Sequence, residues 1–187
     1  MNVKPLNENT APEAAREVLA QVRKKFGFVP NLLGNMANAP ALLKAYLSVS
    51  ALFDETSLTP TERQVVLLAA SAKNNCAYCM AAHTAIAGMQ KVPQDVVSSL
   101  RNRQPIADAK LEALRRFVEE TVETRGWPSE GTRKRFLEAG YSDAQALEVL
   151  LGIGQKTLSN YMNHLSGTPL DEQFAPAAWA AAAGEGR

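Results

Sequence analysis

The sequence lacks a long apolar run, a secretory leader and an excess of charge. Its longest apolar stretches, residues 65–70 and (across a proline) 175–183, are shorter than the roughly 18–20 residues that a membrane-spanning helix needs. The first ten residues have no apolar core of a signal peptide. The 20 basic and 19 acidic residues give a net charge of +1, which removes the electrostatic case for a nucleic-acid partner or an anionic membrane surface. We therefore expect a cytoplasmic protein.

Cysteines and aromatic residues are scarce as well. Two cysteines in 187 residues do not make a disulfide-stapled secreted scaffold. Aromatic residues make up only 6% of the chain, whereas alanine and leucine recur throughout, which favours helix. The length and the 46% hydrophobic share fit one packed domain. We expect a helical domain over residues 1–174 and a mobile, Ala-rich tail over residues 175–187.

Helix start signals divide the chain, and no segment alternates as a strand would. Three capping boxes are predicted, beginning at Thr10, Thr59 and Ser142. Asn38, Asp108 and Ser129 are predicted to cap three further helices, and residues 28–31 read as a connector. The sequence thus predicts an all-α, single-domain bundle of about eight helices.

The two cysteines are three residues apart, and a histidine follows four residues later. On a helix at about 100° per residue, Cys76, Cys79 and His83 fall on one face within about 60° of each other. We expect this helix to start at an Asn75 cap, so that its first turn favours a thiolate at Cys76. A disulfide between the cysteines would close a tiny loop and add little stability, which suits redox cycling. His83 would take or relay a proton.

Two other interpretations of this motif stay open. Each cysteine could be an inert, small buried hydrophobe. Alternatively, Cys76, Cys79 and His83 could bind zinc, with the distant His164 or water as the fourth ligand. A thioredoxin fold is excluded, because no strands are predicted around the motif.

The motif and its flanking segments resemble the alkylhydroperoxidase D-like (AhpD-like) branch of the carboxymuconolactone decarboxylase family. The residues that carry the resemblance are Leu58-Thr-Pro-Thr-Glu-Arg-Gln-Val-Val66 and Asn75-Cys-Ala-Tyr-Cys-Met-Ala-Ala-His-Thr84. Phe26-Gly-Phe-Val-Pro-Asn-Leu32, Ala39-Pro-Ala-Leu-Leu43, Ser159-Asn-Tyr-Met-Asn-His164 and Thr168-Pro-Leu-Asp171 resemble its "peroxidase-related" subgroup.

The resemblance implies an all-helical fold, with the Cys-x-x-Cys at a helix N-terminus, and assembly into homo-trimers or hexamers. It also implies an antioxidant thiol peroxidase that needs no metal or other cofactor and is reduced by an external protein or small dithiol. Cys76 and Cys79 would be the redox pair and His83 the relay histidine. The decarboxylase members of the family lack the cysteine pair.

The sequence departs from the family pattern at two positions. The well-studied members have a glutamate where this chain has Gln64, and some have a histidine where it has Tyr78. A glutamine can orient a group but cannot accept a proton, while a tyrosine hydroxyl can donate to a peroxide. Glu62 is explained by its capping box and lies about 200° around the helix from Gln64. His164 could be a second proton carrier or a packing residue.

The residues predict a thiol oxidoreductase that reduces a hydroperoxide, with the identity of the attacking cysteine left open. One alternative is a disulfide reductase that serves a peroxiredoxin through the same cysteines. Another is a binding or structural member of the family that has lost efficient catalysis, an interpretation that Gln64 motivates.

Overall fold

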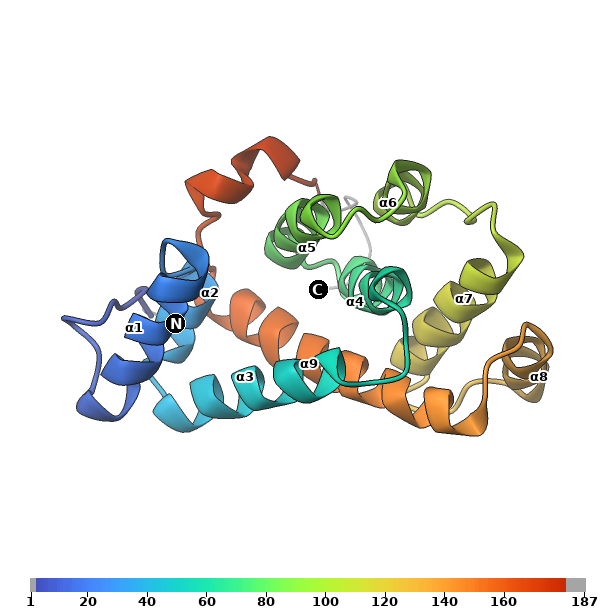
Figure 1. The fold of residues 1–187 in the computed structure, drawn as a ribbon, viewed down its shortest axis with the longest axis horizontal. Coiled ribbons are helices and arrows are strands. Elements are labelled where there is room, and N and C mark those ends of the chain that lie inside the picture. Colours follow the sequence, from blue (N-terminus) through green and yellow to red (C-terminus); the bar gives the residue numbers. More distant parts are fainter. Residues whose placement is uncertain (1–2, 181–187) are drawn as a thin grey trace.

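The computed structural model describes residues 3–180, and this part of the chain is helical without any strand (Figure 1). The predicted all-α class is thereby confirmed, with nine α-helices in the described residues instead of about eight. The helices are α1 (Glu13–Phe26), α2 (Asn31–Met36), α3 (Pro40–Asp54), α4 (Pro60–Lys73), α5 (Ala77–Met89), α6 (Gln94–Arg101), α7 (Ala109–Glu123), α8 (Glu130–Glu138), α9 (Asp143–Ser166) and the 3-10 helix η1 (Glu172–Ala177).

Helix α4 forms the centre of the bundle, between α5, α7 and α9 (Figure 1). Ten of its residues are buried, including the continuous run from Gln64 to Ala72. Its start is fixed by the predicted capping box, in which Thr59 and Glu62 bond each other's backbone amides and Pro60 occupies the first turn. A helix that is apolar nearly all round must be covered on every side, and the other helices provide that cover.

The buried apolar residues form two clusters. The larger joins α4 to α6, α7, α8 and α9, and the smaller joins α1, α2 and α3 to the start of α5. Cys76, Tyr78 and Cys79 belong to the smaller cluster. Helix α9, the longest helix, runs alongside α3 and also contacts α4, so that it borders both clusters (Figure 1).

Three of the predicted caps, at Thr10, Asn38 and Asn75, are wrong, and one helix was missed. Helix α1 starts after Pro12, and the Thr10 hydroxyl instead accepts from the Asn7 amide in the preceding turn. Helix α3 starts after Ala39, with Pro40 in its first turn, and not at Asn38. The segment read as a connector ends in α2, whose residues are almost all buried and therefore show no amphipathic period.

The start of the Ala-rich tail is hydrogen-bonded to the end of α6. The Trp179 indole donates to the Arg101 carbonyl oxygen at 2.8 Å, and the Arg101 guanidinium donates to the carbonyl oxygens of Ala177 and Ala178. These bonds attach the chain after η1 to the end of α6. The rest of the expected mobile tail, residues 181–187, lies outside the described residues.

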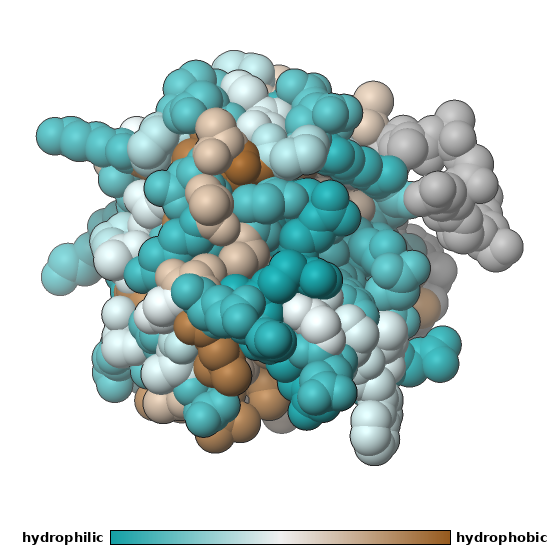
Figure 2. Space-filling model, turned by 90° about the vertical axis from the view of Figure 1, so that its right-hand side faces the viewer, coloured by the Kyte–Doolittle hydropathy of each residue, from teal (hydrophilic) through white to brown (hydrophobic). Residues whose placement is uncertain are grey.

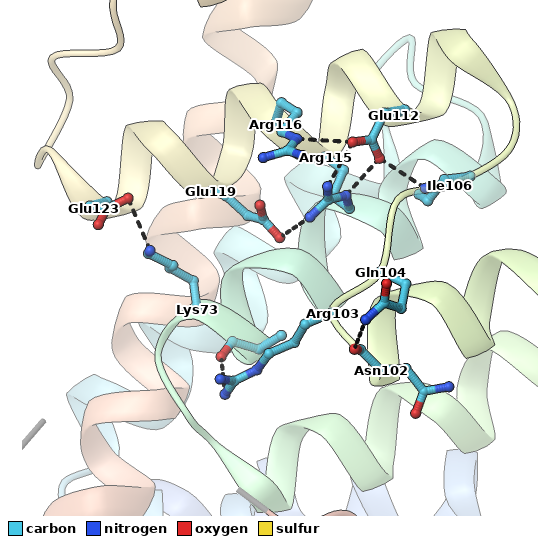
Figure 3. A network of polar contacts seen from close by, with 11 residues as sticks. Lys73, Asn102, Arg103, Gln104, Ile106, Glu112, Arg115, Arg116, Glu119 and Glu123 are labelled. Carbon is cyan, nitrogen blue, oxygen red and sulfur yellow. Dashed lines mark hydrogen bonds and ion pairs between the residues drawn. The ribbon is translucent and has the colours of Figure 1, made fainter. Parts of the chain in front are cut away.

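A charged network lies on the side of α7 that faces Lys73 and the α6–α7 connection (Figure 3). The buried Arg115 donates to Glu112 on one side and to Glu119 on the other, each at 2.6 Å. Glu112 also accepts from the Ile106 amide, and hydrogen bonds from Arg115 and this amide outweigh burial and lower its pKa to about 2. The network attaches the α6–α7 connection to α7.

The face on which α7 and α8 lie is mainly hydrophilic, with apolar residues confined to a narrow band (Figure 2). Within the described residues, every helix is too short or too polar to cross a membrane.

The two glycines inside α9 lie in different surroundings. A Cβ atom on Gly152 would lie 2.6 Å from Val66 Cγ1 and 2.7 Å from Phe53 Cζ, so α9 approaches α3 and α4 closely here. A Cβ atom on Gly154 would meet nothing within 4 Å. The close helix approach is therefore made at Gly152.

We expect Gly152→Ala to lower the free energy of unfolding by about 1–3 kcal/mol, because the added methyl group overpacks the core. Gly154→Ala is the matched control and should raise it by up to about 1 kcal/mol through helix propensity. Urea denaturation of both variants checks this. Equal effects of the two substitutions would contradict the close approach at Gly152.

Candidate active site

The cysteine pair lies at the start of α5, directly after a sharp reversal of the chain. Helix α4 ends at Lys73, and Asn75 adopts a left-handed conformation with φ of 57°. The Cys76 amide then donates to the Ser71 carbonyl oxygen at 3.0 Å. Cys76 is itself the N-cap residue of α5, one position later than the expected Asn75 cap, and Cys79 lies in the first turn. The reversal thus directs the N-terminus of α5 against the interior.

Both cysteines are free thiols and almost fully buried, each 1% exposed. The Asn163 side-chain amide of α9 donates to Cys79 Sγ at 3.3 Å and to Cys76 Sγ at 3.6 Å. Because one amide nitrogen reaches both sulfurs, the two sulfurs lie side by side. Each cysteine also shifts the pKa of the other.

A chain of hydrogen bonds runs through His83, which lies one turn beyond Cys79. Lys156 Nζ of α9 lies 2.9 Å from His83 Nε2, and His83 Nδ1 lies 3.2 Å from Gln64 Oε1 of α4. The Gln64 amide in turn donates to Gln90 Oε1 at 3.1 Å. Lys156 is completely buried, and His83 and Gln64 are nearly so. Side chains from three helices thus meet beside Cys79.

This arrangement separates the two thiols electrostatically. Burial raises the pKa of Cys79, but the hydrogen bond from Cys76, the charge of Lys156 and hydrogen bonds from Ser159 and Asn160 outweigh it and lower that pKa to about 5. The pKa of Cys76 is raised by its hydrogen bond to Cys79 and by burial. Burial and the charge of Lys156 lower the pKa of His83, which keeps it neutral. These opposite shifts favour the thiolate at Cys79 and the thiol at Cys76.

A cavity of about 430 Å³ opens beside Cys79. Cys79, His83 and Lys156 contribute to its wall, while Cys76 does not. Most of the lining is apolar and comes from α1, α2, α3, α5 and η1. A small apolar molecule in this cavity would therefore lie against Cys79 and not against Cys76.

Tyr78 lies at this cavity, but its hydroxyl is occupied. It donates to the buried Asp171 carboxylate and accepts from the Leu32 amide at 3.2 Å. The Asp171 carboxylate also accepts from the Asn31 amide at 3.0 Å, at the start of α2. Burial and the hydrogen bond to Asp171 raise the pKa of Tyr78. These bonds hold α2 and the chain before η1 together as one wall of the cavity.

Of the residues singled out from the sequence, the structure brings Cys76, Cys79, His83 and Gln64 together. Glu62 serves its capping box and pairs with Lys110 at 3.2 Å. His164 is exposed near the end of α9. No group of three metal-ligating side chains (His, Cys, Asp or Glu) gathers anywhere in residues 3–180.

Sequence reasoning missed the contribution of α9. Lys156, Ser159, Asn160 and Asn163 are all buried, whereas Leu147, Leu150 and Leu165 on the same helix are exposed. The available signal was the spacing of three and four residues within this polar set, which places it on one helical face. A polar stripe is ordinarily the solvent face of a helix, and here it faces the cysteines.

Comparison with known proteins agrees with this architecture. Residues 40–120, which include the cysteine pair and His83, match the carboxymuconolactone decarboxylase family. No curated protein is similar enough in sequence to count as a match.

Three solved structures illustrate the likeness of the fold. The AhpD core of a peroxidase-related protein from Ralstonia eutropha JMP134 is 23% identical, with a TM-score of 0.80 over 93% of this chain and 95% of that one. A cysteine-to-alanine variant of the debrominase Bmp8, in complex with 2,3,4-tribromopyrrole, is 17% identical, with a TM-score of 0.79 over 95% of both chains. A peroxidase-related protein from Silicibacter sp. TM1040 is 20% identical, with a TM-score of 0.76 over 87% of both chains.

The fold is thus that of the AhpD-like, peroxidase-related proteins. Residues 40–120 are similar to the carboxymuconolactone decarboxylase family, and the likeness of the whole chain to the AhpD core is one of fold.

We expect Tyr78→Phe to lower the free energy of unfolding by about 1–3 kcal/mol, because it removes a donor to the buried Asp171 and an acceptor for the Leu32 amide. The phenylalanine ring keeps the packing against Phe174. Thermal denaturation measures the stability, and iodoacetamide alkylation of the folded variant measures the reactivity of Cys79, which should change less than about 3-fold. A tenfold loss of reactivity would instead assign the hydroxyl to the chemistry.

Proposed function

We propose that this protein is a thiol-dependent peroxidase in which Cys79 attacks the hydroperoxide and Cys76 resolves the product. The observation that carries the proposal is the position of Cys79 in the cavity wall, with Cys76 outside the lining and bonded to the same Asn163 amide. The thiolate is the nucleophilic form of cysteine, and the lowered pKa of Cys79 provides it at neutral pH.

The reaction requires two steps at the cysteines. The Cys79 thiolate attacks the distal oxygen of the hydroperoxide, the O–O bond breaks, and an alkoxide leaves that takes up a proton to become the alcohol. The Cys76 sulfur then gives up its proton and attacks the Cys79 sulfenic acid, whose hydroxyl leaves with that proton as water. The peroxide gains two electrons and the cysteines lose two. An external dithiol returns them to the disulfide.

The cavity supports an organic hydroperoxide as the substrate. Because the cavity wall is largely apolar, burial of a hydrocarbon group against it adds binding free energy that hydrogen peroxide does not provide. Because both sulfurs are only 1% exposed, a small dithiol fits this entrance better than a folded protein does. The same burial disfavours the alternative role of a disulfide reductase for a peroxiredoxin.

A single turnover tests the proposal. We expect one equivalent of cumene hydroperoxide to remove two thiols from the reduced protein and lower its mass by about 2 Da, the two hydrogens lost on disulfide formation. Cys76→Ser should stop at a sulfenic acid that dimedone traps on Cys79. Cys79→Ser should consume no peroxide. The measurements are a thiol count and intact mass.

Three results would contradict the proposal. If both thiols of the wild type persist, the protein is a binding or structural member of the family. A protein mass that includes zinc would support the metal-binding interpretation. Multiple turnovers by Cys76→Ser would exclude the two-cysteine cycle.

A second candidate substrate is a polyhalogenated aromatic ring. It is favoured by the aromatic side chains at the cavity, where Phe174 packs edge-on against both Phe28 and Tyr78. In this variant the Cys79 thiolate attacks a bromine atom, a proton replaces the bromine on the ring, and Cys76 displaces bromide to form the same disulfide. The debrominase Bmp8, which shares the fold, was solved with such a ring.

Incubation of the reduced protein with tribromopyrrole distinguishes the substrates. One bromide ion released per disulfide formed would support dehalogenation. Thiols that persist with tribromopyrrole but not with cumene hydroperoxide would restrict the function to peroxide reduction.

A further inference from the structure

Lys156 is a fully buried lysine in the middle of α9. Its Nζ atom lies 2.9 Å from His83 Nε2, and its side chain forms part of the cavity wall beside Cys79. Moving an ammonium group out of water costs several kcal/mol even after the protein relaxes, unless an anion pairs with it. A lysine at this position therefore needs a counter-charge.

The counter-charge does not come from a carboxylate. Among the described residues, the titratable groups that face Lys156 are Tyr46 of α3, Cys79 and His83 of α5, and Cys76 at the N-cap of α5. His83 is neutral, and Tyr46 has a phenol hydroxyl. Of the two thiols, only Cys79 shares the cavity wall with Lys156, and its charge raises the pKa of Lys156 more than that of Cys76 does. The Cys79 thiolate is therefore the anion of this pair.

The hydrogen-bond chain fixes the protonation of His83. An ammonium group has only donors, so His83 Nε2 accepts from Lys156 and the ring proton lies on Nδ1. Nδ1 then donates to Gln64 Oε1, and the Gln64 amide donates to Gln90. This order leaves His83 without a lone pair for the substrate, because its basic nitrogen is occupied by Lys156.

The geometry points to Lys156 as the proton donor of the reaction and the counter-ion of the Cys79 thiolate, with His83 as its positioning residue. The inference rests on the proposed peroxidase cycle. When the O–O bond breaks, Lys156 gives its proton to the leaving alkoxide and becomes a neutral amine. When an external dithiol later reduces the disulfide, its two protons go to the Cys76 sulfur and back to Lys156. The ammonium–thiolate pair is then restored.

The pH dependence of Cys79 alkylation tests this assignment without any peroxide. Iodoacetamide reacts with the thiolate, and mass spectrometry locates the label. We expect Lys156→Met to move the midpoint of the rate upward by about 2–3 pH units, which is the effect of one unit charge about 4 Å away at an effective dielectric constant of about 20. Lys44→Met, the same substitution at an exposed position of α3, is the control and should move it by less than about 0.5 unit.

His83→Ala separates the roles of the two residues. If His83 only positions Lys156, its removal should move the midpoint by less than about 1 unit and lower the peroxidase kcat more than it changes KM. The opposite result would overturn the inference. If His83→Ala raises the alkylation midpoint by about 2–3 pH units and Lys156→Met leaves it unchanged, His83 and not Lys156 is the proton carrier.

A measurement on the wild-type protein tests the same assignment if Lys156→Met does not fold. Nitrogen-15 NMR of lysine-labelled protein reports whether Lys156 Nζ is an ammonium or an amine. We expect an ammonium in the reduced protein and an amine after diamide has formed the disulfide. An amine in the reduced protein, or an ammonium in both forms, would overturn the inference. The alkylation and NMR experiments use no peroxide. If only the peroxidase assay failed, the proposed function would be wrong and the result of these two experiments would still stand.

Discussion

A positive charge inside an all-helical core is the constraint on which the rest of this site depends. Lys156 has no contact with solvent, and the groups that satisfy it are His83 and the cysteine pair. The ammonium group stabilises a thiolate that burial alone would disfavour, and the thiolate stabilises an ammonium that would otherwise be deprotonated. Neither charge would persist alone at this depth, which makes the lysine and the cysteine interdependent.

Helix α9 makes this arrangement possible by reversing the usual distribution of residues on a helix. Its buried stripe is polar, with Lys156 and Asn163 directed at the cysteines, and several of its leucines are exposed. The close approach at Gly152 holds the N-terminal half of α9 against α3 and α4. The second half can therefore present polar groups to the start of α5 at fixed distances.

Local features were the best guide to the fold and the site. Capping boxes at Thr59 and Ser142 formed as predicted, because the partners in each lie three residues apart. The shared face of Cys79 and His83 likewise follows from the pitch of one helix. The predicted cap at Thr10 failed because its hydroxyl bonds the turn before the helix, and α2 was missed because it is buried on all sides.

The sequence by itself determined the helical class, the start of α5 to within one residue and the pairing of two thiols with a histidine, since all of these depend on neighbours within two helical turns. Only the tertiary structure decided which side chains surround each thiol. Lys156 is 73 residues from His83 and Asp171 is 93 from Tyr78. No local rule relates residues so far apart. Their contact exists because α9 and the segment after it pack against α5, and burial there makes each charge effective.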